Sequence, residues 1–558
     1  MGKSDELVQT VGKLLVGLLV ITTIAVTPWM TIDPINLIKL VTLTSAGFAI
    51  GALLLFNSTR ALLVQHRLVL VLSVFFALQL TLVFLFSGID KSSQFFGTMG
   101  RNTGLLCYLS LLMVLIGAVA SSNSILYRKI IGAAVATGAI SGLYGVIQFY
   151  GVDPIGWANK YSPVIGFLGN PNFQSSLLGM SAIAGLVILI DASVHVSRRL
   201  LSLFVLLVSL FVATVSNSQQ GLLVFALGSV VLVFFKIKSF KKPLLTTSYF
   251  LTVIAASCLS VLGFLNKGFL SGYLYQASVT YRGDYWRAGW NMALENPLFG
   301  VGLDSYGDNY RKYRTIEAIL RRGPEIVSNA AHNVFIDFAA NAGIPLLAIY
   351  LGFMLFAVRK ILIYIQSEVR DIYFEGIIAV WIGYTAQSLI SINQIGLAVW
   401  GWALTGLIIG WKQNSDIPIE TKIYMKNSKN KKETPVLSPK NLLTLISGLA
   451  VGLVLSIPPL VASSQVKSAL ATSQLETVLK AERSWPRDPA RSNQIAVLLV
   501  SNKLEKDALR IARATTNQFP MNFDAWKVLS EIPATPKEEK TLALSNMQKL
   551  DPLNPTLK

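Results

Sequence analysis

The residues between 281 and 333 include side chains that can do chemistry beside a charged group. The run YRGDYWRAGW at 281–290 places Arg282 and Arg287 among aromatic side chains, and His332 follows in Ala331-His332-Asn333. A guanidinium can bind two phosphate oxygens at once, and a neutral imidazole can take a proton from an attacking hydroxyl group. These residue types suit acid–base chemistry next to a bound anion.

Each of these residues also has a simpler interpretation. A helix capped by Thr280 would place its aromatic rings at the level of lipid headgroups and its arginines on anionic lipids. His332 would then cap, or hydrogen-bond to, the entrance of the next helix. The residues alone leave both interpretations open, and the elements that position them are needed to choose.

The composition places most of the chain in a lipid bilayer. Its 558 residues are 53% hydrophobic and 14% charged, whereas a soluble domain carries about a quarter charged residues. The apolar residues form runs of about 18–22, long enough to cross a hydrocarbon core of about 30 Å. The net charge of +19 lies mostly in short connections, which argues against nucleic-acid binding. Cys107 and Cys258 fall in apolar runs, so we expect no cysteine metal site.

The expected fold is all-α, a polytopic transmembrane bundle of about twelve or thirteen spans with a large external loop and a small helical C-terminal domain. The candidate spans lie at residues 11–29, 35–56, 67–86, 104–121, 130–149, 173–192, 200–216, 221–236, 247–265, 335–357, 375–391, 395–411 and 442–461. None carries an ionisable residue near its centre, which argues against a proton or ion pathway.

The lysines and arginines indicate the orientation. Every second connection is basic and the alternate short ones are nearly free of cations, which is the positive-inside pattern. The N-terminus is therefore expected in the cytoplasm, with residues 151–172, the loop 266–334 and the tail on the outer side. His332 is then the one histidine at an outer boundary. The basic connections hold Arg60 and Arg67, Arg128 and Lys129, Arg198 and Arg199, Lys236 to Lys242, Arg359 and Lys360, and Lys426 to Lys432.

We expect a membrane domain at residues 1–461 and an external helical tail at 462–558. Apolar residues at helical spacing, with turns at Pro486, Pro520 and Pro552, resemble degenerate tetratricopeptide repeats. The alternative is an unrelated helical hairpin docked on the membrane domain. Repeats of this kind offer concave binding surfaces, and no catalytic group is evident in the tail. We therefore expect the tail to bind an acceptor or protein partner, and its removal to spare the membrane domain.

Further motifs precede and follow the arginine-rich run, and all of them fall on the predicted outer face. Their order, over about residues 90–410, resembles that of the O-antigen ligase and polymerase superfamily of bacterial membrane glycosyltransferases. The landmarks are GRNTGL at 100–105, Gly169-Asn170-Pro171-Asn172, Ser218-Gln219-Gln220-Gly221, Arg282 with Trp286, NPLFGVG at 296–302, and Ala331-His332-Asn333 with Ala342-Gly343.

The resemblance implies an enzyme of the bacterial inner membrane that takes a glycan from an undecaprenyl-diphosphate carrier and transfers it, without a metal or other cofactor, to a hydroxyl acceptor. That acceptor is a lipid, a growing glycan or a protein. Asp337 is a weaker candidate to orient His332, because a separation of five points two residues apart on a helix. The implied catalytic residues are His332 and Arg282, and the implied substrate contacts are Arg101, Asn170, Asn172, Gln219, Gln220, Trp286 and Arg287.

One departure and several alternatives accompany this resemblance. Where the family commonly has arginine in a Ser-Arg-Gly-like turn, this chain has Gln219 and Gln220, whose amides supply no charge. Arg101 or Arg287 would then bind the diphosphate, or the donor differs. A polysaccharide polymerase or protein O-oligosaccharyltransferase fits the same motifs. Outside the enzymes, a lipid-linked glycan flippase and an envelope scaffold are the alternatives.

Overall fold

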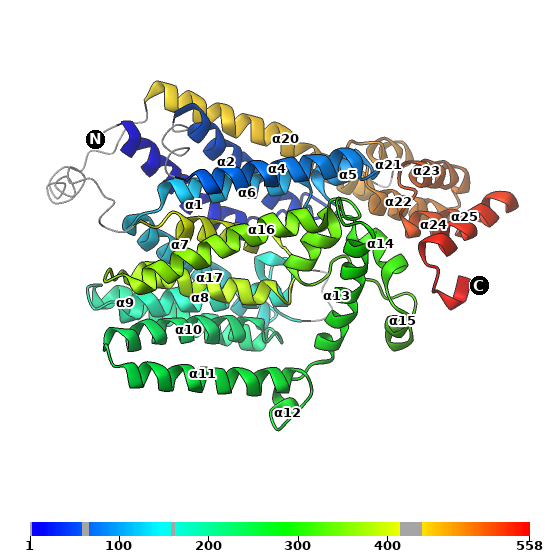
Figure 1. The fold of residues 1–558 in the computed structure, drawn as a ribbon. Coiled ribbons are helices and arrows are strands. Elements are labelled where there is room, and N and C mark those ends of the chain that lie inside the picture. Colours follow the sequence, from blue (N-terminus) through cyan, green and yellow to red (C-terminus); the bar gives the residue numbers. More distant parts are fainter. Residues whose placement is uncertain (1–2, 58–65, 158–161, 413–437, 473, 558) are drawn as a thin grey trace.

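The computed structural model of the protein describes residues 3–57, 66–157, 162–412, 438–472 and 474–557, and within these ranges every regular element is helical (Figure 1). Arg60 and Lys426 to Lys432, from two of the expected basic connections, lie outside the described residues. The helices before the large loop are α1 (Lys3–Ile24), α2 (Asn36–Asn57), α4 (Arg67–Phe86), α5 (Lys91–Phe96), α6 (Leu105–Ser121), α7 (Ser124–Phe149), η1 (Gly166–Leu168), α8 (Pro171–Ile190), α9 (Val196–Val215), α10 (Gln220–Ser239) and α11 (Pro243–Phe264).

The large loop contains four short or medium helices, and two groups of helices follow it. The loop helices are α12 (Ser271–Leu274), α13 (Ala277–Glu295), α14 (Tyr306–Tyr313) and α15 (Ile316–Arg322). The bundle is completed by α16 (Val334–Gln366), α17 (Ile372–Ser388), α18 (Ile395–Ile409) and α20 (Pro439–Thr472). The tail contains α21 (Leu475–Glu482), α22 (Pro489–Ser501), α23 (Glu505–Gln518), α24 (Phe523–Glu531), α25 (Lys537–Leu550) and η4 (Pro555–Leu557).

The bundle helices lie side by side. A segment in lipid forms a helix because a helix satisfies its own backbone hydrogen bonds. Among the described residues, ten helices are long and apolar enough to cross a membrane. The other three expected spans correspond to α6 and α17, of 17 residues each, and α18, of 15. Every residue of α18 is buried, which explains why it is apolar on all sides. The chain is thus a multi-pass, all-helical membrane protein.

A close crossing of two segments explains the glycines of the NPLFGVG run. Val301 N donates to Ala340 O at 2.8 Å, and Ile344 N donates to Pro297 O at 2.8 Å. Gly300 has φ +60°, and a Cβ there would lie 2.4 Å from Ala340 O. Gly343 has φ +83° and interrupts α16, where a Cβ would lie 2.4 Å from Leu298 O. The turn is therefore bound directly to the backbone of the kinked helix.

The segments expected on the outer side gather at one end of the bundle. Figure 1 shows α5, the loop helices α13–α15 and the tail helices at this end, while the N-terminus lies at the opposite end. The helix α13 begins at Ala277 with no side-chain cap, so the expected cap at Thr280 is wrong and that residue lies inside the helix. The fold thus brings the candidate residues to the end that also carries the tail.

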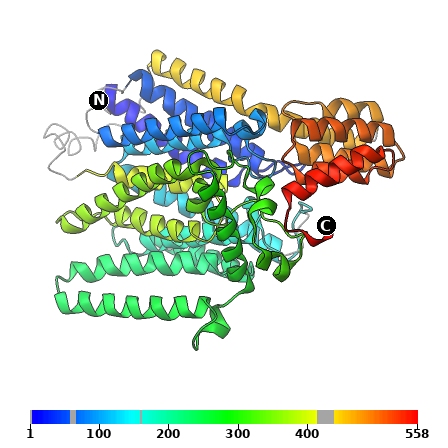
Figure 2. The same cartoon turned by 45° about the vertical axis from the view of Figure 1, so that its right-hand side comes forward.

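The tail has its own apolar core but continues directly from the last membrane helix. The expected boundary at 461/462 lies inside α20, whose Val466 and Ala469 pack with the tail core. In this core, α22 contacts α23 and α24 contacts α25. Figure 2 shows these helices as a compact group beside the end of the bundle. The tetratricopeptide-like assignment and the exact domain boundary stay predictions.

Candidate functional site

The helix α13 lies against the segment that carries His332. The ring centroids of Tyr285 and His332 are 5.2 Å apart, and Trp286 Nε1 donates to His332 O at 3.4 Å. Tyr306 OH donates to Tyr285 O at 2.7 Å, which holds α14 on the same helix. The structure therefore brings His332 and the arginine-rich run together, although they are far apart in the sequence.

His332 is not the cap of the helix that follows it. Asn333 takes that role, because its Oδ1 accepts hydrogen bonds from Phe335 N at 3.0 Å and Ile336 N at 3.1 Å. His332 itself has φ +53°, in the left-handed region that non-glycine residues rarely adopt. In the part of the chain that the structure describes, no hydrogen bond engages its imidazole nitrogens. The ring is therefore available to a ligand.

The electrostatic surroundings keep this imidazole neutral. Burial, together with the positive charges of Arg282, Arg101 and Arg322, lowers the pKa of His332 to about 4. The ring is half-buried. At neutral pH it therefore carries a free lone pair and no charge, as a base must. The nearby cations also make this region attractive to an anion.

Arg282 is a cation of this group without a counter-ion among the described residues. Among the described residues it forms no ion pair, and burial lowers the pKa of its guanidinium. Its neighbour Arg321, by contrast, is paired with Asp284 at 2.6 Å. Arg287 is exposed on the same helix. A half-buried guanidinium without a carboxylate partner is suited to a phosphate from outside the protein.

Arg322 also belongs to this group and was missed in the sequence analysis. Its guanidinium lies 4.3 Å from the centre of the Tyr281 ring and donates to Tyr285 OH. It comes from the end of α15, just before Gly323 with φ +88°. The chain reversal between α13 and α15 brings it to Tyr281, and although the NPLFGVG run lies in that reversal, no motif includes Arg322 itself.

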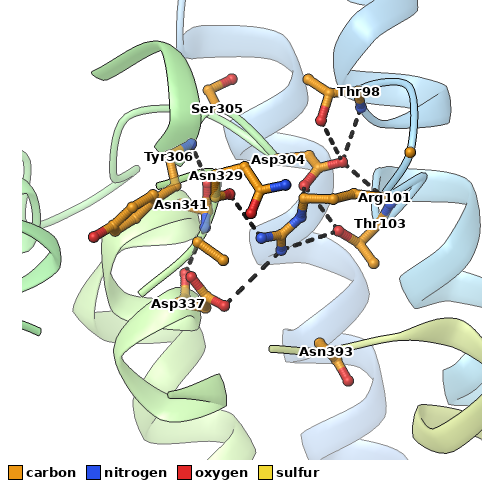
Figure 3. A network of polar contacts seen from close by, with 12 residues as sticks. Thr98, Arg101, Thr103, Asp304, Ser305, Tyr306, Asn329, Asp337, Asn341 and Asn393 are labelled. Atoms are coloured by element: carbon orange, nitrogen blue, oxygen red, sulfur yellow. Dashed lines mark hydrogen bonds and ion pairs between the residues drawn. The ribbon is translucent and has the colours of Figure 1, made fainter. Parts of the chain in front are cut away.

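Arg101 is buried and pairs with carboxylates inside the protein. Its guanidinium is 3% exposed; Nε lies 2.9 Å from Asp304 Oδ1, and Nη1 donates to Asn329 O at 2.7 Å (Figure 3). Asp337 Oδ2 lies 3.9 Å from Nη2. The charge of Arg101 is thus buried against two carboxylates, and its contact with a substrate stays a prediction. The positive charge of Arg101 acts on His332 through space, and its hydrogen bond to Asn329 O holds the backbone just before His332.

Asp304 organises the turn that precedes α6, and sequence reasoning did not identify it. Its Oδ2 accepts from Thr98 N at 2.8 Å and Thr103 N at 3.2 Å, and its Oδ1 accepts from Thr103 Oγ1 at 2.8 Å. A Cβ on Gly97 would lie 2.6 Å from Asp304 Oδ2. The glycine-rich motif around residue 100 thus encloses a carboxylate, as Figure 3 shows.

Asp337 acts on the backbone next to His332 and not on its ring. Its Oδ1 accepts from Ala331 N at 2.8 Å, while Arg101 holds the carbonyl of Asn329. The segment just before His332 is therefore fixed by a buried carboxylate and a buried guanidinium. This arrangement gives Asp337 a role different from the orienting role considered from the sequence.

The amide residues form a second group, at the starts of α8 and α10. Asn170 caps α8 by accepting from Asn172 N, and Ser218 Oγ donates to Asn172 Oδ1 at 2.8 Å. Ser176 Oγ lies 3.3 Å from Gln220 Oε1, and Gln219 Nε2 donates to Tyr273 O at 3.4 Å. The structure thus joins two predicted motifs to each other. Their role in substrate binding stays a prediction.

Comparison with known proteins is consistent with this arrangement. A family model described as O-antigen ligase matches residues 172–351, which include the second amide turn, α13 and His332. The chain matches no curated protein and no solved structure. The order of the motifs, the helical bundle and this match agree in relating residues 172–351 to the O-antigen ligase family.

Proposed function

We propose that the protein transfers a glycan from an undecaprenyl-diphosphate carrier to a hydroxyl acceptor at the outer face of the bacterial inner membrane. One observation carries the proposal: a neutral His332 without a hydrogen-bond partner lies in the field of Arg282, a cation without a counter-ion. The similarity of residues 172–351 to the O-antigen ligase family supports an enzyme of cell-surface glycan biosynthesis.

The reaction exchanges one bond to the anomeric carbon for another. The acceptor oxygen forms the new C–O bond while the bond from that carbon to the diphosphate oxygen breaks. His332 takes the hydroxyl proton, and Arg282, with Arg322 beside it, stabilises the charge that develops on the leaving diphosphate. The energy of the lipid diphosphate drives transfer, so no nucleotide is consumed.

The same geometry serves a polysaccharide polymerase or a protein O-oligosaccharyltransferase, and the acceptor decides between them. A flippase or an envelope scaffold would not need His332 and Arg282 as reacting groups. These alternatives are separated by assaying purified protein with undecaprenyl-diphosphate glycan and candidate lipid, glycan and peptide acceptors.

The deciding experiment compares His332→Ala and Arg282→Ala with His195→Ala. We expect each of the first two to lower the turnover number at least about a hundredfold, the usual loss of an acid–base group or charge stabiliser. His195 is exposed at the start of α9, so its variant should keep full activity. Near-normal release of lipid diphosphate by both active-site variants would rule out His332 and Arg282 as the reacting groups, whereas no release by the wild type would favour the flippase and the scaffold.

Conservative variants then separate the two roles. Arg282→Lys should recover only part of the activity, because lysine keeps the charge but loses the planar fork. His332→Gln should remain nearly inactive, since glutamine hydrogen-bonds but does not take a proton at neutral pH. Donor binding, measured with labelled lipid, should survive in His332→Ala and be lost in Arg282→Ala.

A further inference from the structure

The last turns of the tail end in a buried carboxylate that binds the external loop. Asp551 is fully buried, and its oxygens lie 2.7 and 2.8 Å from Nη2 of Arg314. Nη1 of Arg311 donates to the same carboxylate at 3.2 Å. Asn554 Nδ2 adds a further hydrogen bond at 3.0 Å. Two loop arginines therefore share one tail carboxylate in a site closed to solvent.

The same arginines hold together the loop that leads to the candidate site. Arg314 Nη1 donates to Pro324 O at 2.8 Å and Ile326 O at 3.2 Å, and Arg311 Nη1 donates to Pro324 O at 2.9 Å. These bonds close the segment between α14 and residue 326, which contains Arg322. A contact that holds Arg314 in place therefore also holds this segment, which carries Arg322 and leads to His332.

Other contacts from the tail fall on the same part of the loop. Asn522 Nδ2 donates to Asp308 Oδ1 at 2.9 Å, and the Arg311 guanidinium lies 4.1 Å from the centre of the Phe523 ring. Lys527 Nζ lies 3.6 Å from Glu325. Figures 1 and 2 both show the C-terminal helices beside α14 and α15. The tail thus contacts α14 from two helices and a turn.

We propose that Asp551 is a positioning residue for glycan transfer: through Arg311 and Arg314, the tail holds the loop that carries the candidate catalytic groups. This rests on the proposed function of that loop. It assigns the tail a role in transfer to every acceptor, whereas an acceptor-binding tail would affect one acceptor only. A buried charge left without its partner is costly, so loss of Asp551 should release the loop rather than leave it in place.

The test uses full-length Asp551→Ala and Asp551→Asn, with Glu539→Ala as the matched control. Glu539 pairs with Arg513 on the exposed side of the tail, 2.6 Å away, and makes no contact with the loop in the described structure. Asp551→Asn keeps the side-chain volume and serves if the alanine variant does not fold. Hydrogen exchange of residues 311–332 and transfer to lipid and small soluble acceptors are measured on the same preparations.

We expect faster exchange in residues 311–332 by at least about tenfold, with the bundle helices unchanged. We also expect the turnover number to fall about a hundredfold on every acceptor, as for a misplaced reacting group, while the donor KM changes less than about threefold. Glu539→Ala should match the wild type in both measurements. Unchanged exchange in the Asp551 variants, or loss of transfer to one acceptor alone, would overturn the proposal. Hydrogen exchange tests the contact between Asp551 and the loop even if the wild type transfers no glycan. Failure of the proposed function can therefore be told apart from failure of this proposal.

Discussion

The imidazole of His332 lies in a positive field, and its titration follows from that field. Three guanidinium groups, those of Arg282, Arg101 and Arg322, act on it in addition to burial. The lowered pKa means that the ring stays neutral as the pH falls through the range in which an ordinary histidine becomes charged. A bound diphosphate would supply negative charge and counteract this field.

Removing one of these cations should raise the pKa of His332. We expect Arg322→Met to shift the acid limb of kcat/KM for the donor to higher pH, because protonation of the ring then costs less. The measurement is the pH dependence of transfer, compared with Arg513→Met in the tail, which should leave the limb in place. An unchanged limb in Arg322→Met would mean that a group other than His332 titrates.

The buried pair of Arg101 and Asp304 predicts a non-additive loss of stability. Removing one partner of a buried ion pair costs about 3–5 kcal/mol, because the other charge remains buried. We expect this loss for Arg101→Met, and a smaller loss than the sum of the single changes for Arg101→Met with Asp304→Asn. Thermal unfolding of the detergent-purified proteins measures both. Strict additivity would show that the two charges do not depend on each other.

At the scale of helices, the sequence predicted the membrane spans but not the contacts between segments far apart in the chain. The spans were predictable, because a run of apolar residues must become a helix in lipid wherever it lies, and each of the thirteen expected spans overlaps a helix. The pairing of Arg314 with Asp551 was not predictable, because 237 residues separate them and no motif links the two. Arg322 and Asp304 escaped detection for the same reason.

The crossing of the NPLFGVG turn and α16 predicts two sensitive glycines. Gly300→Ala and Gly343→Ala should each destabilise the protein, by about 1–3 kcal/mol from the left-handed backbone alone and more from the backbone contact. Gly132→Ala in α7 is the control, because a Cβ there meets nothing within 4 Å. Helix propensity should make that variant neutral or slightly more stable. Thermal unfolding distinguishes the three, and equal stability would contradict the close crossing.

The contact between α14 and the tail should depend on pH. Burial raises the pKa of Asp308 to about 7, helped by the charges of Asp524, Asp488 and Asp304 and opposed by the hydrogen bond from Asn522. A carboxyl group with a raised pKa contributes stability that is complete below its ordinary pKa and is lost as the pH rises through about 7. Residues 311–332 should therefore be better protected from exchange, after correction for intrinsic rates, at pH 6 than at pH 8. Asp308→Asn should remove the difference, and a difference that persists would assign it to another group.

For the whole molecule, the arrangement of the loops is informative about topology. The loop helices α13–α15 and the tail, both expected outside, lie at the same end of the bundle, and the charge pattern supports placing this end outside the cell. Cysteines tested in a Cys258→Ser background report on this orientation. Suitable positions must be exposed; Asn309 in the loop and Ser492 in the tail, for example, are buried and would not report.

We expect Leu320→Cys and Ser501→Cys to react with a membrane-impermeant thiol reagent in intact cells, and Ser239→Cys to react only after lysis. Leu320 is 80% exposed in the loop, Ser501 is exposed in the tail, and Ser239 is exposed at the opposite end. Reaction at Ser239→Cys in intact cells would reverse the orientation.

The position of Asp551 near the C-terminal end of the tail has a consequence for biosynthesis. The loop with His332 leaves the ribosome long before the carboxylate that binds Arg314 has been made. If Asp551 positions this loop as we propose, the loop lacks that support until the tail has been made and has folded against it. A chain cut after α20 would then insert into the membrane but transfer no glycan.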